Sequence, residues 1–261
     1  MLRAFSTAAT GMTGQQMIVD VIANNLANIN TTGFKRSQVD FQDLMYLKLA
    51  QAGRETASGV VAPTGIEIGS GVRLAATTKV FTPGELENTG RQLDVAISGD
   101  GFFEVTLPDG STRYTRDGSF QLNASRELVT SKGYTLGGGL TIPQEAVQIS
   151  IGVDGTVTCH TASGTTTNVG TLSLVRFPNA SGLSSEGDNL LAATEASGTA
   201  ITGTAGAQGF GTLQQSFLEK SNVQMVTELV NLIKAQRAYE INSRAIRAGD
   251  EMLNTANRLI S

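Results

Sequence analysis

Apolar residues near the C-terminal end of the chain recur every three or four positions. The spacing runs from Met225 to Ile260, with no glycine or proline before Gly249, and it is typical of a coiled-coil seam. The seam positions are Met225, Leu229, Leu232, Gln236, Tyr239, Ser243, Ile246, Asp250, Leu253, Asn257 and Ile260. The pattern predicts a helix from about residue 215 to residue 261, roughly 65–70 Å long at 1.5 Å per residue. A helix of that length with one apolar face needs a partner along it.

The N-terminal stretch carries a matching pattern and is the predicted partner. Its seam positions are Leu2, Phe5, Ala9, Met12, Gln16, Val19, Ala23 and Leu26. Between residues 1 and 32 the charged side chains are Arg3 and Asp20 alone, whereas a helix that faces water usually carries many charges. One C-terminal helix cannot cover all of this surface. We therefore expect other copies of the chain to cover the rest.

Polar residues interrupt both seams at regular intervals. In the C-terminal helix, Gln236, Ser243, Asp250 and Asn257 occupy alternate core layers, and Gln16 does so in the N-terminal helix. Polar core residues lower stability but can fix helix register and partner choice. The alternative is that these side chains border solvent at the edge of the seam.

Residues 46–71 differ from both helices. Small and polar residues dominate, and the short runs Val60–Pro63 and Ile66–Ile68 flank a turn at Pro63–Gly65. We expect a protruding hairpin or a long loop here. Because a structureless loop of this length is improbable inside a compact domain, it is expected to make contacts elsewhere.

The region from residue 72 to residue 212 is rich in predicted strands separated by Asp-Gly and Pro-Asp-Gly turns. The expected strands are 94–97, 102–107, 112–115, 127–130, 134–136, 147–151, 156–159 and 172–177. Residues 184–211 are rich in Gly, Ala and Thr and are expected to form a loop.

The predicted fold class is therefore α+β. The N- and C-terminal helices form a coiled-coil domain, with an extended segment and an inserted antiparallel β domain between them. The expected boundaries are 1–33 with 215–261 for the helices, 34–90 for a connecting region, 91–200 for the β domain and 201–214 for a return linker.

Composition removes several classes of function. The net charge is −4 and no cluster of Lys or Arg is present, which argues against nucleic-acid binding. With Cys159 as the single cysteine, a disulfide within the chain is excluded. The longest apolar runs are too short for a membrane-spanning helix, and the N-terminus lacks the apolar core of a cleaved signal peptide.

Catalytic motifs are not evident. Gly137-Gly138-Gly139 lacks the following Gly-Lys-Ser/Thr of a phosphate-binding loop, and no Gly-x-Ser-x-Gly sequence occurs. Cys159 and His160 are adjacent in a predicted strand and point to opposite faces, so a joint metal site is geometrically poor. The Asp-Gly pairs lack the ligand spacing of a calcium loop. We expect no enzyme activity, no cofactor and no metal.

Three stretches resemble the bacterial flagellar rod and hook protein family. They are 23–36 (ANNLANINTTGFKR), 218–230 (LEKSNVQMVTELV) with its continuation through 236–242 and 250–253, and the segments 99–105 and 114–120 of the β region. The N-terminal motif contains Asn24, Asn25, Leu26, Asn28, Gly33 and Phe34. Within the family, the chain length and the segment 46–71 resemble the distal rod members, in which an extended segment is thought to make the tube straight and stiff.

The resemblance implies a structural subunit that polymerises helically into a hollow rod crossing the periplasm and transmits torque from motor to hook. It implies export through the flagellar type III apparatus without a cleaved signal peptide, and self-assembly beside the proximal rod protein, the hook protein and the ring proteins around the rod. The terminal helices would form the inner wall and the β domain the outer surface. The alternatives are a proximal rod or hook-type axial protein, or, in another class, a secreted β-domain enzyme or a carbohydrate-binding module.

Specific residues follow from these expectations. Leu2, Phe5, Met12, Val19 and Leu26 are expected to pack against the C-terminal helix at positions that include Leu229, Leu232, Gln236, Tyr239, Ile246 and Leu253. The extended segment is expected to contact adjacent copies through Gly59, Val60, Pro63 and Ile66.

Overall fold

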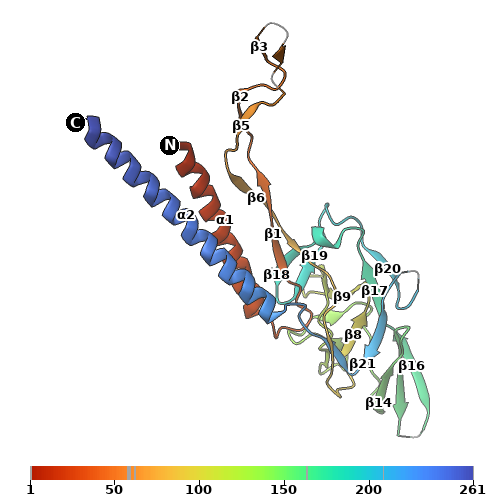
Figure 1. Ribbon diagram of the computed structural model, residues 1–261. Coiled ribbons are helices and arrows are strands. Elements are labelled where there is room, and N and C mark those ends of the chain that lie inside the picture. The colour runs from red at the N-terminus through yellow and green to blue at the C-terminus, as the bar shows by residue number, and fades with distance from the viewer. Residues whose placement is uncertain (1, 58–59, 62, 163, 208, 261) are drawn as a thin grey trace. The chain divides into compact units, whose positions relative to one another are not determined.

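The structure, a computed structural model, describes residues 2–57, 60–61, 63–162, 164–207 and 209–260. It confirms the α+β class, with one helix at each end of the chain and antiparallel strands between them (Figure 1). The chain divides into two compact units. A helix unit comprises residues 1–26, 37–78 and 225–261, and a β unit comprises residues 27–36 and 79–224. The long segment 37–78 thus belongs with the helices, whereas the sequence assigned it to a separate connecting region.

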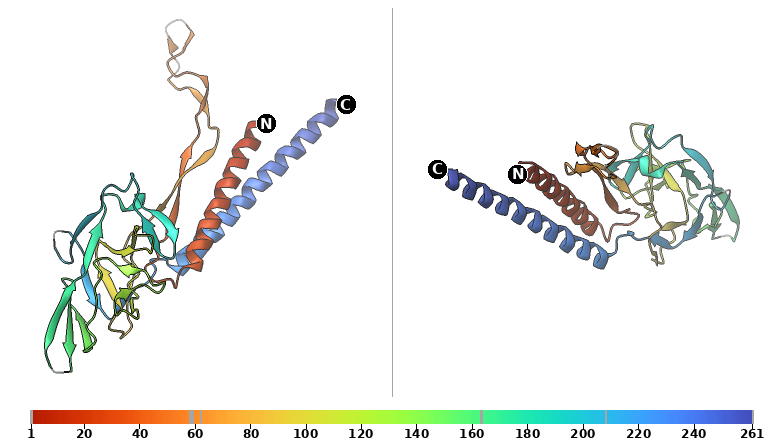
Figure 2. Two further views of the ribbon diagram at one scale, coloured as in Figure 1. Left: turned by 180° about the vertical axis from the view of Figure 1, so that it is seen from behind. Right: turned by 45° about the horizontal axis from the view of Figure 1, so that its top comes forward.

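Two antiparallel helices dominate the helix unit. Helix α1 spans Leu2–Ala27 and helix α2 spans Met225–Ile260. They run side by side in each view, with the N- and C-termini at the same end (Figures 1 and 2). The 36 residues of α2 correspond to about 54 Å. The expected helix start near residue 215 is wrong, because residues 212–219 form strands of the β unit.

The remainder of the helix unit is a narrow β ribbon folded from residues 37–78, whose last strand continues to Lys79. Its strand pairs are β1 (Ser37–Asp43) with β6 (Val72–Lys79), β2 (Leu47–Ala50) with β5 (Ile66–Ile68), and β3 (Glu55–Ala57) with β4 (Val60–Val61). The expected hairpin is confirmed. The ribbon is longer than predicted, because β1 and β6 extend it beyond residues 46–71 at both ends.

The β unit is built around one sheet in the order β11-β12-β13-β9-β10-β19-β18, to which β17 and β20 are joined through β9. A second sheet has the order β14-β15-β16, and β7 and β8 pair with β22 and β21. The strands are β7 (Leu86–Asn88), β8 (Val95–Ser98), β9 (Phe102–Thr106), β10 (Thr112–Thr115), β11 (Gln121–Leu122), β12 (Leu128–Val129), β13 (Thr135–Leu136), β14 (Ala146–Ile151), β15 (Thr156–Thr161), β16 (Thr166–Thr171), β17 (Ser173–Arg176), β18 (Ser184–Gly187), β19 (Leu190–Ala192), β20 (Ile201–Thr204), β21 (Thr212–Gln215) and β22 (Phe217–Glu219), with a 3₁₀ turn η1 at Ala180–Gly182.

All eight predicted strands of the β region coincide with observed ones, but the loop expected over 184–211 is wrong. Strands β18, β19 and β20 lie within it, and β19 pairs with β10 in the main sheet. Leu190 and Leu191 are both buried. Two adjacent leucines in a polar stretch are too weak a pattern to predict a strand. Whether such a short segment forms a strand depends on pairing with a neighbouring strand rather than on intrinsic propensity.

Two apolar cores stabilise the β unit. The larger is centred on fully buried side chains such as Ile97, Phe103, Phe120 and Leu174, and it includes Leu213 from β21. The smaller contains Phe102, Tyr114 and Phe177, whose rings meet edge to face. Leu213 is opposite Ile97 in the β8–β21 ladder. Residues that shortly precede α2 in the sequence are therefore part of the larger core of the β unit.

Candidate assembly elements and the charged junction

Close packing of α1 on α2 occurs at glycines. A Cβ atom at Gly249 of α2 would lie 2.8 Å from the Phe5 ring of α1, and one at Gly11 of α1 would lie 2.8 Å from Nδ2 of Asn242. The absence of a side chain at each position lets the helix backbones approach, since interhelical distance is set by the side chains at the contact.

The face of α2 that is covered within the chain is offset by one residue from the predicted seam. Glu228, Ala235 and Gly249 are buried and Asn242 is half-buried, at intervals of seven. Gln236 and Asp250 are exposed and Ser243 is half-buried, while the side chain of Asn257 lies outside the described residues. The covered positions keep the heptad interval. Within the single chain, the covered positions come one residue before the predicted polar layer, at small residues such as Ala235 and Gly249.

The predicted helix contacts are distributed as follows. In α1, Phe5, Met12, Val19 and Leu26 are half-buried, Gln16 is exposed, and the side chain of Leu2 is outside the described residues. In α2, Leu232, Ile246 and Leu253 are half-buried, whereas Leu229 and Tyr239 are 41% and 44% exposed. The single chain leaves much of both apolar faces uncovered.

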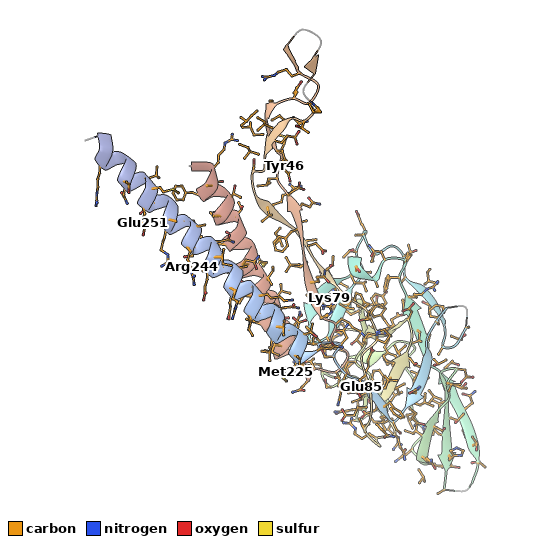
Figure 3. All side chains as sticks on the ribbon, in the orientation of Figure 1. Tyr46, Lys79, Glu85, Met225, Arg244 and Glu251 are labelled. Atoms are coloured by element: carbon orange, nitrogen blue, oxygen red, sulfur yellow. The ribbon has the colours of Figure 1, made fainter. Side chains whose placement is uncertain are left out.

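On the ribbon, apolar and charged side chains separate onto opposite faces. Leu47 pairs with Ile68 across β2 and β5, and the next pair along, Lys48 with Glu67, is an exposed ion pair. Ile66 and Pro63 are exposed as well, as is Tyr46, which Figure 3 labels. Gly59 and the side chain of Val60 lie outside the described residues.

A buried cluster of three charged residues lies in the β unit. Nζ of Lys35 is 2.6 Å from Oε1 of Glu219, and Nε of Arg116 is 3.4 Å from Oε2. The three side chains are 1–3% exposed. Lys35 also donates to the carbonyl of Thr82, and the Gly84 amide donates to Glu219. One carboxylate thus lies between two buried cations, and we call these three residues the charged junction.

Burial dominates the electrostatics of the charged junction. It lowers the pKa of the Lys35 ammonium, against the opposing effect of Glu219, and it lowers the pKa of the Arg116 guanidinium in the same way. Arg116 donates to the carbonyls of Gly101 and Gly99, at 2.9 Å and 2.8 Å. Breaking such a cluster by removing one partner is costly, since an uncompensated buried charge remains.

The charged junction joins the three stretches that carry the family resemblance. Lys35 comes from the N-terminal motif, Arg116 from the β region and Glu219 from the segment before α2. Gly33 donates its amide to the carbonyl of Glu219 at 2.8 Å. Its φ is +67°, and a Cβ there would lie 2.7 Å from the backbone of Arg116, so only glycine fits.

Phe34, the next residue of the N-terminal motif, contacts a cation: Nζ of Lys79 lies 5.7 Å from the centre of its ring.

The family resemblance rests on these stretches, but the sequence alone did not single out Lys35, Arg116 or Glu219. The one indication of their importance was that each lies within a motif of the family. Of the motif residues that it did single out, Asn25 is buried and Asn28, Gly33 and Phe34 are half-buried, while Asn24 is exposed.

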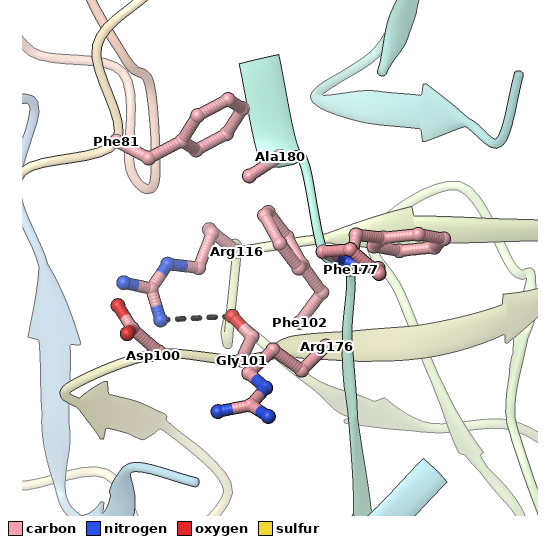
Figure 4. A pocket seen from close by; sticks show the side chains of 9 residues that line it. Phe81, Asp100, Gly101, Phe102, Arg116, Arg176, Phe177 and Ala180 are labelled. Carbon is pink, nitrogen blue, oxygen red and sulfur yellow. Dashed lines mark hydrogen bonds between the residues drawn. The ribbon is translucent and has the colours of Figure 1, made fainter. Parts of the chain in front are cut away.

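Next to Arg116 is a pocket of about 230 Å³ (Figure 4). Its walls include the rings of Phe81, Phe102 and Phe177, and the guanidinium of Arg116 donates to Gly101 at its base. Among the described residues, no group of three or more His, Cys, Asp or Glu side chains could hold a metal ion. Within the same residues, no helix has the length and apolar character needed to span a membrane.

Three family models match the chain. The flagella basal body rod protein model matches residues 5–35, the flagellar hook protein FlgE/F/G D1 domain matches 96–159, and the flagellar basal body rod FlgEFG protein C-terminal domain matches 214–259. The flagellar basal-body rod protein FlgG of Borreliella burgdorferi is 46% identical over 262 residues, covering 99% of both chains. The FlgG of Caulobacter vibrioides is 43% identical over the full length of both, and that of Bacillus subtilis 39% identical over 97% of both.

The chain belongs to the FlgG family of flagellar basal-body rod proteins. As a FlgG-family chain it is a structural subunit of the distal flagellar rod, as the sequence predicted. Lys35 is the last residue matched by the N-terminal family model, and Glu219 lies near the start of the stretch matched by the C-terminal one. The charged junction therefore connects these two matched stretches through the ion pair of Lys35 and Glu219.

Proposed function

We propose that copies of this chain polymerise helically into a hollow rod through the two helices and the β ribbon. The proposal rests on the apolar surface that a single chain leaves uncovered. On α2 the exposed apolar residues include Met225, Val226, Leu229, Val230, Ile233, Ile241 and Met252, and on the ribbon they include Met45, Leu47, Leu49, Ile66 and Ile68. Many exposed large apolar side chains on the same elements indicate an interaction surface.

Helical polymers form when one surface of a subunit contacts a different surface of the next and the rotation does not close a ring. In the proposed rod, the apolar seams of α1 and α2 pack against the same helices of other copies, forming the inner wall. Many parallel packed helices would make the rod stiff enough to carry torque, so the role is mechanical rather than catalytic.

The proposal extends to location and partners. The rod crosses the periplasm, and the chain reaches it through the flagellar type III apparatus. At the ends of the rod the chain contacts the proximal rod protein and the hook protein, and ring proteins surround it. The FlgG relatives, which are named as basal-body rod proteins, support this setting.

The ribbon offers the sharpest test of assembly. Ile68→Glu places a carboxylate on its apolar face, whereas Lys48→Glu places one on the opposite, charged face. In cells whose own copy is deleted, we expect Ile68→Glu to reduce the number of complete rods in purified basal bodies at least tenfold. A buried charge at an interface costs several kcal/mol. Lys48→Glu removes an exposed pair worth about 0–1 kcal/mol and should assemble normally.

Circular dichroism of both purified variants provides the folding control, and both should match the unsubstituted chain. A normal number of rods with Ile68→Glu would show that the apolar face of the ribbon is not an assembly contact.

A further inference from the structure

Every backbone polar group of the consecutive residues Arg36 and Ser37 is hydrogen-bonded, and two asparagine side chains make most of these bonds. Ser37 is the first residue of β1, where the ribbon begins. Asn25 and Asn222 come from two of the motifs that carry the family resemblance, one near the end of α1 and the other just before α2. Neither has a role in the assembly contacts proposed above.

Asn25 pairs with both backbone groups of Ser37, as a neighbouring strand would. The Ser37 amide donates to Oδ1 at 2.9 Å, and Nδ2 donates to the Ser37 carbonyl at 2.9 Å. Asn25 is 2% exposed. The last turns of α1 are therefore tied directly to the first residue of the ribbon, and water is kept from competing for these bonds.

Asn222 acts on the preceding residue. Its Oδ1 accepts from the Arg36 amide at 2.8 Å, and its Nδ2 donates to the Val80 carbonyl at 2.8 Å. The Val80 amide in turn donates to the Arg36 carbonyl at 3.0 Å. Asn222 thus bridges the chain that leads into β1 and the chain that leaves β6.

We propose that Asn25 and Asn222 are positioning residues: Asn25 holds the first residue of the ribbon against α1, and Asn222 holds together the two chain segments at Arg36 and Val80 that border the ribbon. An amide suits this task because it offers a donor and an acceptor side by side, whereas a carboxylate of the same size lacks the donor. The inference rests on the proposed function to this extent only: the ribbon must contact other copies for its position to affect assembly.

The test compares Asn25→Ala and Asn222→Ala with Asn30→Ala, a control at an exposed position in the turn after α1. The measurement is the rate of backbone hydrogen exchange over residues 36–44 in the full-length chain. Asn25→Ala removes the two hydrogen bonds of a buried side chain. Asn222→Ala removes the bonds of a half-buried side chain to Arg36, Val80 and Thr82. We expect exchange there to become about tenfold faster, and to be unchanged by the control.

Alanine at position 25 also separates positioning from helix stability. Alanine is the best helix former and asparagine a poor one, so helix content measured by circular dichroism should stay the same or rise while the ribbon base loosens. Loss of helix in step with faster exchange would overturn the proposal. Unchanged exchange in both asparagine variants would overturn it as well.

Rods counted in basal bodies from cells that carry each variant distinguish this inference from the proposed function. Fast exchange with few rods supports both. Fast exchange with a normal number of rods supports the positioning role and shows that assembly does not depend on the position of the ribbon. Few rods with unchanged exchange overturns the positioning role and leaves the proposed function standing.

Discussion

At the residue scale, Glu219 connects parts of the β unit that are far apart in the sequence. Its carboxylate compensates Lys35 and Arg116, and its backbone carbonyl accepts from Gly33. A net positive cluster buried to this degree is costly to form unless each group is paired. The segment before α2 and the segment after α1 are consequently held at one place in the β unit.

Replacing Glu219 with glutamine should destabilise the β unit strongly. Two cations would stay buried without a carboxylate, and removing one partner of a buried ion pair costs about 3–5 kcal/mol. Urea unfolding of the purified chain, followed by far-ultraviolet circular dichroism, gives the free energy. Glu87→Gln breaks the exposed pair with Lys220 and should change it by less than about 1 kcal/mol. Equal effects of the two substitutions would contradict the role assigned to the charged junction.

For the motif residues, the sequence predicted which positions matter but not what they contact. The resemblance identified Asn25, Gly33 and Phe34 as significant positions. It could not show that Gly33 lies against Arg116 and Glu219, since 83 residues or more separate them in the sequence and no local pattern encodes that contact.

At the element scale, small residues contribute to the packing of α1 on α2 as much as large ones do. The heptad spacing of α2 survives in the structure, but Ala235 and Gly249 lie on the covered face, where Gln236 and Asp250 were expected. Heptad counting weights large apolar residues. A close helix pair also selects residues that let backbones approach, and that requirement appears only when both helices are present.

Enlarging Gly249 should separate the helices. A valine there would overlap the Phe5 ring, whose nearest atoms are 2.8 Å from the ideal Cβ position. Overpacking of this kind typically costs 1–3 kcal/mol, measurable as a lower free energy of unfolding or melting temperature of the helix signal at 222 nm.

Ala248→Val is the control, because Ala248 is the adjacent, exposed position. Valine is a poorer helix former than alanine but a better one than glycine, so helix propensity alone would favour the Gly249 variant over the control. If both variants melt alike, the close approach of α1 and α2 at Gly249 is incorrect.

At the scale of the whole molecule, the β unit is completed by residues that come late in the sequence. Strand β21 pairs with β8, whose first three residues are buried, and Leu213 is 1% exposed in the larger core. Gln215 donates to the carbonyl of Ile149 and accepts from the amide of Ile151, which secures the edge of the second sheet. The segment 212–224 is therefore part of the β unit, although the sequence assigned 201–214 to a linker and 215 onward to the helix.

Two truncations test this division. A chain ending at Gln224 lacks α2 but keeps β21, β22 and the charged junction, so its β unit should unfold cooperatively, as in the full-length chain. A chain ending at Gly211 loses Leu213 and Glu219 and leaves β8 unpaired, and it should lack a cooperative thermal transition by circular dichroism. A cooperative transition in the shorter chain would show that the β unit does not require its last strands.

The sequence by itself determined the α+β class, the two terminal helices, most β strands, the hairpin and the family, because these depend on periodicity, turn residues and local motifs that are read along the chain. The tertiary structure decided which face of α2 is covered, that 184–204 contains strands, that 212–219 belongs to the β unit, and that Lys35, Arg116 and Glu219 meet. These features depend on contacts between residues far apart in the sequence. Their energies come from burial and pairing that no local segment contains.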